Sequence, residues 1–123
     1  MQAASSRRGT REGQDQHRFE ALEISLALIR CLRPVVARLE QRDRGLARQL
    51  REAASSVALN LGEGRRRVGK DRLHFWRIAG GSAGEVLACL RVAEAWGHLG
   101  DAELDEALGY TDSLLAITWT LTR

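Results

Sequence analysis

Apolar residues recur at every third or fourth position along most of the chain, which is the spacing of α-helices that bury one face. The first such stretch covers about residues 18–41 and carries two apolar stripes. The stripes consist of Leu22, Leu26, Ile29 and Val36 on one side and of Ile24, Leu28, Cys31 and Val35 on the other. Two stripes predict that this helix packs against two neighbours.

Turn residues separate this stretch from the next two. Asp43 and Gly45 indicate a turn with a helix cap, after which the apolar repeat runs to about residues 62–64. The third stretch covers roughly residues 70–96 and stops at Gly97, a residue type that often ends helices. The pattern therefore predicts a second and a third helix with a short connection between them.

A fourth apolar repeat follows Asp101, which we expect to cap a fourth helix. Four helices joined by short connections predict an all-α fold, an antiparallel up-down-up-down four-helix bundle over residues 18–123. Within the third helix, Gly80, Gly81 and Gly84 each weaken helix formation by about 1 kcal/mol. We therefore expect another helix to approach closely at these glycines, either within the bundle or across a subunit interface.

Composition agrees with one helical domain, because 44% of the residues are hydrophobic, 28% are charged and only one is Pro. Residues 1–17 have almost nothing to bury, and we expect a disordered basic tail there. The longest uncharged runs have ten residues, whereas a bilayer span needs about 18. With no signal-peptide pattern at the N-terminus, we expect a cytoplasmic protein that makes no membrane contact. Cys31 and Cys89 are too few for a disulfide framework and indicate buried thiols.

Charge is divided unevenly along the chain. Residues 30–77 hold 13 basic and 5 acidic residues, a net charge of +8, whereas residues 78–123 hold 2 basic and 7 acidic residues, a net charge of −5. Residues 1–29 hold four of each, so the whole chain carries +3. This separation predicts a basic and an acidic surface, which suit a polyanion, a complementary protein or a second copy of the chain.

The densest group of cations falls between the second and third helices. Clusters of this kind bind phosphates with little dependence on sequence, and we expect nucleic acid, RNA in particular, as the partner. The predicted contact residues are Arg65, Arg66, Arg67, Lys70 and Arg72, helped by Arg42, Arg44 and Arg48. The alternative interpretation is a solvated loop without a partner.

Residues 64–70 also match the spacing G-x-x-x-x-G-K of a phosphate-binding loop. That motif needs Ser or Thr after the Lys, and Asp71 follows Lys70 here, so we exclude nucleotide binding at this loop. No Glu-x-x-His pair of a carboxylate-bridged metal bundle occurs, and no nucleophile has a base at a recognisable spacing. The sequence predicts a non-enzymatic protein with no catalytic residues, no metal and no cofactor.

Polar residues share one face of the second helix and face a matching group on the third. The set comprises Arg51, Ser56, Asn60, Glu63, Ser82 and Glu85. If these faces meet, a half-buried hydrogen-bond network would form and fix the register of the two helices. The alternative is an enzyme site at Asn60, Glu63 and Glu85, which would need an open pocket and a carboxylate of raised pKa.

The same region resembles a known family. Residues 49–64 read QLREAASSVALNLGEG, and they are followed by Phe75, Ile78, Ala79, Gly81, Ser82 and Glu85. This pattern resembles the 23S rRNA-intervening-sequence protein family, over about residues 19–121. The chain departs from the family in its N-terminal tail, in Gly62 where Ala is common, and in Pro34. Five residues of the predicted network match polar positions of the family's motif, for which the resemblance implies no catalytic role: Arg51, Asn60, Glu63, Ser82 and Glu85.

The resemblance implies a four-helix bundle that assembles into a ring, a homo-oligomer and specifically a pentamer, with an association with ribosomal RNA. A related branch resembles the accessory proteins of diversity-generating retroelements, which implies a reverse transcriptase as a possible protein partner. The residues also favour an oligomer, because Tyr110, Ile117 and Trp119 lie off the apolar stripe of the fourth helix. A protein-interaction scaffold, in which a basic edge meets an acidic edge near residues 103–112, is the alternative to nucleic-acid binding.

Overall fold

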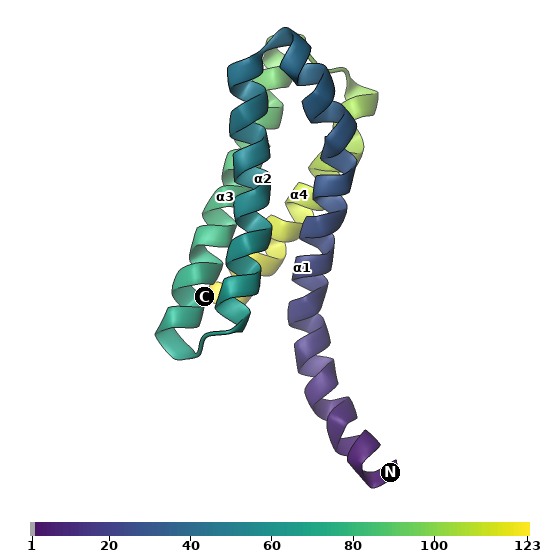
Figure 1. The fold of residues 1–123 in the computed structure, drawn as a ribbon, viewed down its shortest axis with the longest axis vertical. Helices are drawn as coiled ribbons and strands as arrows, with labels where there is room; N and C mark the ends of the chain where they lie inside the picture. Colours follow the sequence, from purple (N-terminus) through teal and green to yellow (C-terminus); the bar gives the residue numbers. More distant parts are fainter. Residues whose placement is uncertain (1) are drawn as a thin grey trace.

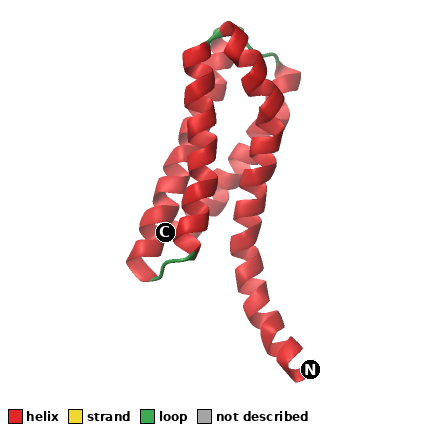
Figure 2. Cartoon of the chain, viewed as in Figure 1, coloured by secondary structure: helices red, strands yellow, loops and turns green. Residues whose placement is uncertain are grey.

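Four helices make up the fold in the computed structural model, which describes the backbone of residues 2–123 and the side chains of residues 20–123. They are α1 (Gln2–Arg42), α2 (Arg44–Arg65), α3 (Gly69–Ala95) and α4 (Asp101–Thr122), and no strand occurs in this described part (Figure 2). The predicted all-α class with four helices is confirmed. The predicted disordered tail, residues 1–17, lies outside the residues whose side chains are described and stays a prediction.

Each helix packs against two others. α2 contacts α1 and α3, and α4 contacts α3 and α1. Figure 1 shows the α1–α2 and α3–α4 connections at one end of the molecule and the α2–α3 connection at the other. The expectation that the first helix has two packing partners is confirmed, and the core lies between the four helices.

Short-range chemistry explains where the helices begin and end. The side chain of Asp43 accepts a hydrogen bond from the backbone N–H of Leu46 at 3.1 Å, which caps α2 as predicted. After α3, Gly97 has φ = 75°, the left-handed conformation that glycine adopts at low cost. The prediction that Asp101 caps α4 is wrong, because the N-cap is Gly100 and Asp101 is the first residue inside the helix.

The buried face of α1 runs between the two predicted stripes. Its buried residues follow a spacing of four and three: Ala21, Ser25, Leu28, Leu32, Val35 and Leu39. Leu28 and Val35 were expected there, whereas most of the other predicted stripe residues are half-buried on the flanks. Ser25 fits this apolar line because its hydroxyl donates to the backbone oxygen of Leu22 at 2.6 Å.

Close approaches at glycine occur at two places that position the helices. A Cβ built on Gly64 would lie 2.5 Å from Cδ1 of Trp76, so the indole of α3 packs directly on the backbone of α2. A Cβ on Gly80 would lie 3.1 Å from Oγ1 of Thr118 on α4. Gly81 and Gly84 have nothing within 4 Å of such an atom, so the predicted close approach is confirmed within the chain at Gly80 only, and an approach across a subunit interface at Gly81 and Gly84 stays a prediction.

Candidate nucleic-acid interface

The α2–α3 connection is a tight three-residue loop, residues 66–68, whose backbone is tied to the end of α2. The N–H of Arg66 donates to the oxygen of Glu63, and the N–H of Arg67 donates to the oxygen of Gly64, each at 3.1 Å. Gly69 then begins α3 with φ = 57°, a conformation that glycine allows. The loop therefore holds its basic side chains on a rigid turn.

Arg72 closes the end of α2. Its Nε donates to the oxygen of Gly64 at 3.1 Å, and its Nη2 donates to the oxygen of Arg65 at 3.0 Å. These oxygens belong to the last turn of α2, where a positive charge is also stabilised by the negative end of the helix dipole. The guanidinium lies 5.3 Å from the centre of the Trp76 ring, whose Nε1–H donates to the oxygen of Leu61 at 3.3 Å. Arg72 is thus part of the α2–α3 packing.

Arg67 is engaged by a carboxylate. Its Nη2 lies 2.8 Å from Oε1 of Glu63, one turn earlier in the chain, and its guanidinium lies 5.2 Å from the centre of the Phe75 ring. The hydrogen bond and the charge of Glu63 raise the pKa of Arg67, and the charge of Asp71 adds to the effect. Part of the positive charge predicted for the loop is therefore neutralised within the chain.

Arg66 in the loop and Lys70 in the first turn of α3 are exposed. Neither side chain has a hydrogen bond or an ion pair with another residue in the part of the chain that the structure describes. Arg65 is half-buried and contacts other parts of the chain. The two exposed cations are the members of the predicted cluster whose charge is most available to a partner.

The remaining predicted contact residues lie at the opposite end of α2. This helix has 22 residues, a length of about 33 Å, so Arg44 and Arg48 in its first turns stand far from the loop. Arg42 donates to the backbone oxygen of His98 and ties the α1–α2 connection to the α3–α4 connection. The eight predicted residues therefore form two separate groups, and the structure does not bring them together into one surface.

The predicted polar network is smaller in the structure. The hydroxyls of Ser56 on α2 and Ser82 on α3 lie 2.8 Å apart, and Asn60 Nδ2 donates to the Ser56 backbone oxygen at 2.9 Å and to its hydroxyl at 3.0 Å. Glu63 instead pairs with Arg67, and Glu85 is exposed. The network thus links α2 to α3 through three of the six predicted residues.

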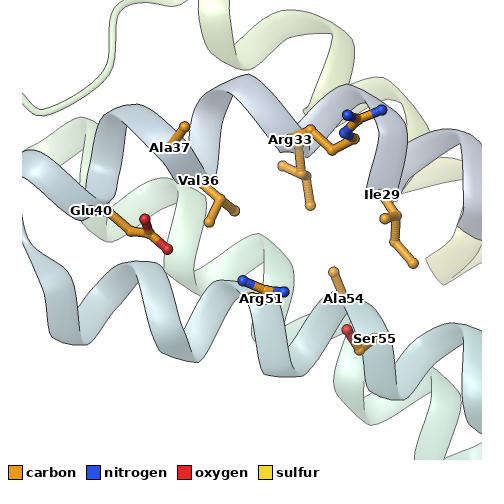
Figure 3. A pocket seen from close by; sticks show the side chains of 9 residues that line it. Ile29, Arg33, Val36, Ala37, Glu40, Arg51, Ala54 and Ser55 are labelled. Carbon is orange, nitrogen blue, oxygen red and sulfur yellow. The ribbon is translucent and has the colours of Figure 1, made fainter.

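Arg51, the sixth predicted network residue, lines a groove between α1 and α2 with a volume of about 430 Å³. Figure 3 shows Arg51 and Ala54 pointing from α2 toward Val36 and Ile29 on α1. Arg51 therefore faces α1 rather than the Ser56–Ser82 contact. The cause is its position on the helix, because residue 51 stands about 140° around α2 from residue 56.

Arg77 and Trp119 are two residues that the sequence analysis did not place in a binding site. Arg77 Nη2 donates to the backbone oxygen of Thr122 at 3.2 Å, so it joins α3 to the end of α4. Trp119 is 67% exposed, while Tyr110 and Ile117, which were grouped with it, pack against the chain's own core. A sequence signal for Arg77 existed, since it lies seven residues after Lys70 and so shares a helix face with it.

Both cysteine thiols lie in surroundings that raise their pKa. Burial raises the pKa of Cys89, with a smaller contribution from Glu85, and burial and Glu106 raise the pKa of Cys31. Both thiols are thus disfavoured as thiolates. Within the described part of the chain, no group of three or more possible metal ligands occurs, and no helix has a stretch long and apolar enough to span a bilayer.

Comparison with known proteins gives two findings. Residues 18–119 match the family described as 23S rRNA-intervening sequence protein. Among solved structures, the fold is similar to a protein with unknown function from the S23 ribosomal protein family of Bacteroides thetaiotaomicron, with a TM-score of 0.77 and 13% sequence identity. The similarity covers 86% of this chain and 97% of the other. No curated protein matches the chain.

Proposed function

The chain belongs to the 23S rRNA-intervening sequence protein family, and from this premise we propose that it is a non-enzymatic protein that binds RNA through the α2–α3 end. The binding unit is an antiparallel up-down-up-down bundle, and it acts as a homo-oligomer in the cytoplasm. Phosphates would be held by the loop between α2 and α3, with the cations at the other end of α2 in a secondary role.

The exposure of Arg66 and Lys70 carries this proposal. A cation that already has a carboxylate partner, such as Arg67, must exchange that partner for a phosphate and gains less from binding. Arg66 and Lys70 have no such competitor within the described chain. They also stand on the loop and on the first turn of α3, which Arg72 fastens to the end of α2, so little ordering entropy is lost when RNA binds.

The double variant R66A/K70A tests the proposal. We expect its affinity for a short RNA oligonucleotide to fall by about tenfold or more at low salt, because two cations that hold phosphates are removed. With single-stranded RNA, the slope of log affinity against log salt concentration should become shallower by about 0.7 for each of these cations. Fluorescence anisotropy at several salt concentrations measures both quantities, and far-UV circular dichroism checks the fold.

A matched control removes the same charge at the opposite end. R44A/R48A also deletes two exposed cations from α2, but at the end of the helix that lies about 33 Å from the loop. We expect a smaller loss of affinity for this variant. RNA binding that is unchanged in R66A/K70A, or that falls more in R44A/R48A, would contradict the assignment of the α2–α3 end.

The homo-oligomer, a pentamer by family resemblance, is supported by apolar residues that the monomer leaves uncovered. Leu59 on α2 is 72% exposed, and Ile78 and Val92 on α3 are exposed as well. Ile78 and Val92 are 14 residues apart and lie on the same outer face of α3. Burial of such residues between subunits would remove apolar surface from water.

A protein-interaction scaffold is the second candidate. It is favoured by the exposed acidic residues Asp105 and Asp112 on α4, whose charge complements the exposed arginines of α1 and α2. The partner could be a second copy or a protein such as a reverse transcriptase. In this case salt would dissociate the oligomer in the absence of RNA, as measured by light scattering. The R66A/K70A substitutions would leave the affinity of the protein for RNA unchanged.

A further inference from the structure

An exposed tryptophan lies at the same end of the molecule as the basic loop. Trp119 stands in the last turn of α4, and Arg77 of α3 reaches the backbone of this turn at Thr122. The indole is 67% exposed and has no hydrogen bond or ring contact with another residue of the described chain. Most of this ring is therefore open to stacking against a flat partner.

The ring borders a small groove between α3 and α4. The groove has a volume of about 230 Å³ and is lined by Arg77, Gly80, Leu115, Thr118, Trp119 and Thr122. It is smaller than the roughly 300 Å³ at which sites for drug-sized molecules begin, so it suits one planar ring rather than a whole extended ligand. Its lining includes a guanidinium and no carboxylate.

A line of positive charge connects this groove with the basic loop. Lys70 and Arg77 are seven residues apart, so they lie on one face of α3 at a separation of about 10 Å along the helix axis. Lys70 stands in the first turn of α3, directly after the loop that carries Arg66. A strand whose phosphates follow Arg66, Lys70 and Arg77 would bring a neighbouring base to Trp119.

We propose that the α3–α4 groove holds an unpaired nucleobase stacked on Trp119, while Arg66, Lys70 and Arg77 hold the adjoining phosphates. The ligand class is therefore single-stranded nucleic acid. Stacking on an aromatic side chain accepts any base and excludes a paired one, because the faces of a base in a duplex are already covered. This inference rests on the proposed function and adds a preference for single strands to it.

The variants W119L and W119F test the stacking. We expect W119L to lose about fivefold or more of its affinity for a single-stranded homopolymeric RNA, and W119F to keep most of it because the ring is retained. Affinity for an RNA duplex of equal length should not change in either variant. Trp119 is exposed, so both variants should fold, and circular dichroism verifies this.

Fluorescence gives a second measurement. In the W96F background the two remaining indoles are Trp76, which is buried, and Trp119, so quenching on addition of single-stranded RNA reports on the groove. The matched control W96L changes the other exposed tryptophan, at the opposite end of α3, and should leave RNA affinity unchanged. The proposal would be overturned if W96L lost as much affinity for single-stranded RNA as W119L does.

The outcomes separate this inference from the proposed function. If neither single-stranded nor duplex RNA binds, the proposed function fails. If both RNAs bind, and their affinity falls in R66A/K70A but not in W119L, only the stacking site is wrong. A change in the mass of the oligomer in W119L, measured by light scattering, would place Trp119 between subunits and would also overturn the stacking site.

Discussion

At the scale of single residues, the contact between Gly64 and Trp76 positions the basic loop. The indole lies where a side chain at residue 64 would be, and its N–H donates to Leu61 on the same helix. The Arg72 guanidinium lies 5.3 Å from the centre of the indole and closes the end of α2. The loop that carries Arg66 thus depends on a glycine whose lack of a side chain makes room for the indole.

The substitution G64A should destabilise the protein. The new methyl group would lie 2.5 Å from Cδ1 and 2.6 Å from Nε1 of Trp76, so the indole or the helices must move. Overpacking of this kind costs about 1–3 kcal/mol of unfolding free energy. Urea denaturation followed by circular dichroism measures the change.

G62A is the matched control on the same helix. Nothing lies within 4 Å of a Cβ at residue 62, and alanine loses less backbone entropy on folding than glycine. We expect G62A to stabilise the protein by about 0.5–1 kcal/mol. Equal destabilisation by G62A and G64A would show that the close contact with Trp76 is not the cause.

At the scale of elements, α2 and α4 begin in different ways. The Asp43 side chain caps α2, whereas the backbone of Gly100 precedes α4 without a side-chain cap. Asp101 and Glu103 still lie in the first turn of α4, where their negative charges interact favourably with the positive end of the helix dipole. The start of α2 therefore depends on one side chain, and the start of α4 does not.

Replacement of the cap should show this dependence. D43A removes the acceptor for the Leu46 N–H and should lower the unfolding free energy by about 1 kcal/mol. D43N keeps a capping oxygen without the charge and should retain most of that stability. D101A, which removes no cap hydrogen bond, is expected to cost less than D43A in the same thermal or urea unfolding measurement. If D43N lowered the unfolding free energy as much as D43A does, the effect would come from the charge of Asp43 and not from the cap. That charge also lies 3.4 Å from Nε2 of His98.

At the scale of the whole molecule, one core joins all four helices. Leu28 and Leu50 from α1 and α2 and Leu90 and Leu114 from α3 and α4 are completely buried in the same cluster. Cys89 belongs to this cluster, and burial raises the pKa of its thiol. Its chemical reactivity should therefore report on the opening of the entire bundle.

In a C31S background, Cys89 should react slowly with a thiol reagent such as DTNB at pH 8. The raised pKa leaves less thiolate at that pH than in the unfolded chain, and the reagent cannot reach a side chain that is 4% exposed. Labelling should accelerate across the urea range in which circular dichroism records unfolding. Native-state labelling at the rate of an unfolded thiol would contradict a closed core around Cys89.

The charge pattern illustrates how far sequence reasoning reached. It located the basic cluster correctly along the chain, because a run of arginines is a property of sequence. It treated Arg44 and Arg48 as helpers of the loop, although a helix of 22 residues separates them from it. It also grouped Arg67 and Arg72 with the exposed cations, because the contacts of Arg67 with Glu63 and of Arg72 with the end of α2 depend on rotamers and helix geometry.

The sequence by itself determined the four helices, their ends within a few residues except for the start of α1, the Asp43 cap and the family, since each depends on periodicity, turn chemistry or a local motif. Only the tertiary structure decided which face of α1 is buried, because two stripes of similar apolarity leave the choice to the packing of α2 and α4. Tertiary packing likewise reduced the polar network to Ser56, Asn60 and Ser82 and placed Trp119 beside Arg77. Such contacts between distant segments arise from the crossing of helices, a geometry that the periodicity of a single helix does not encode.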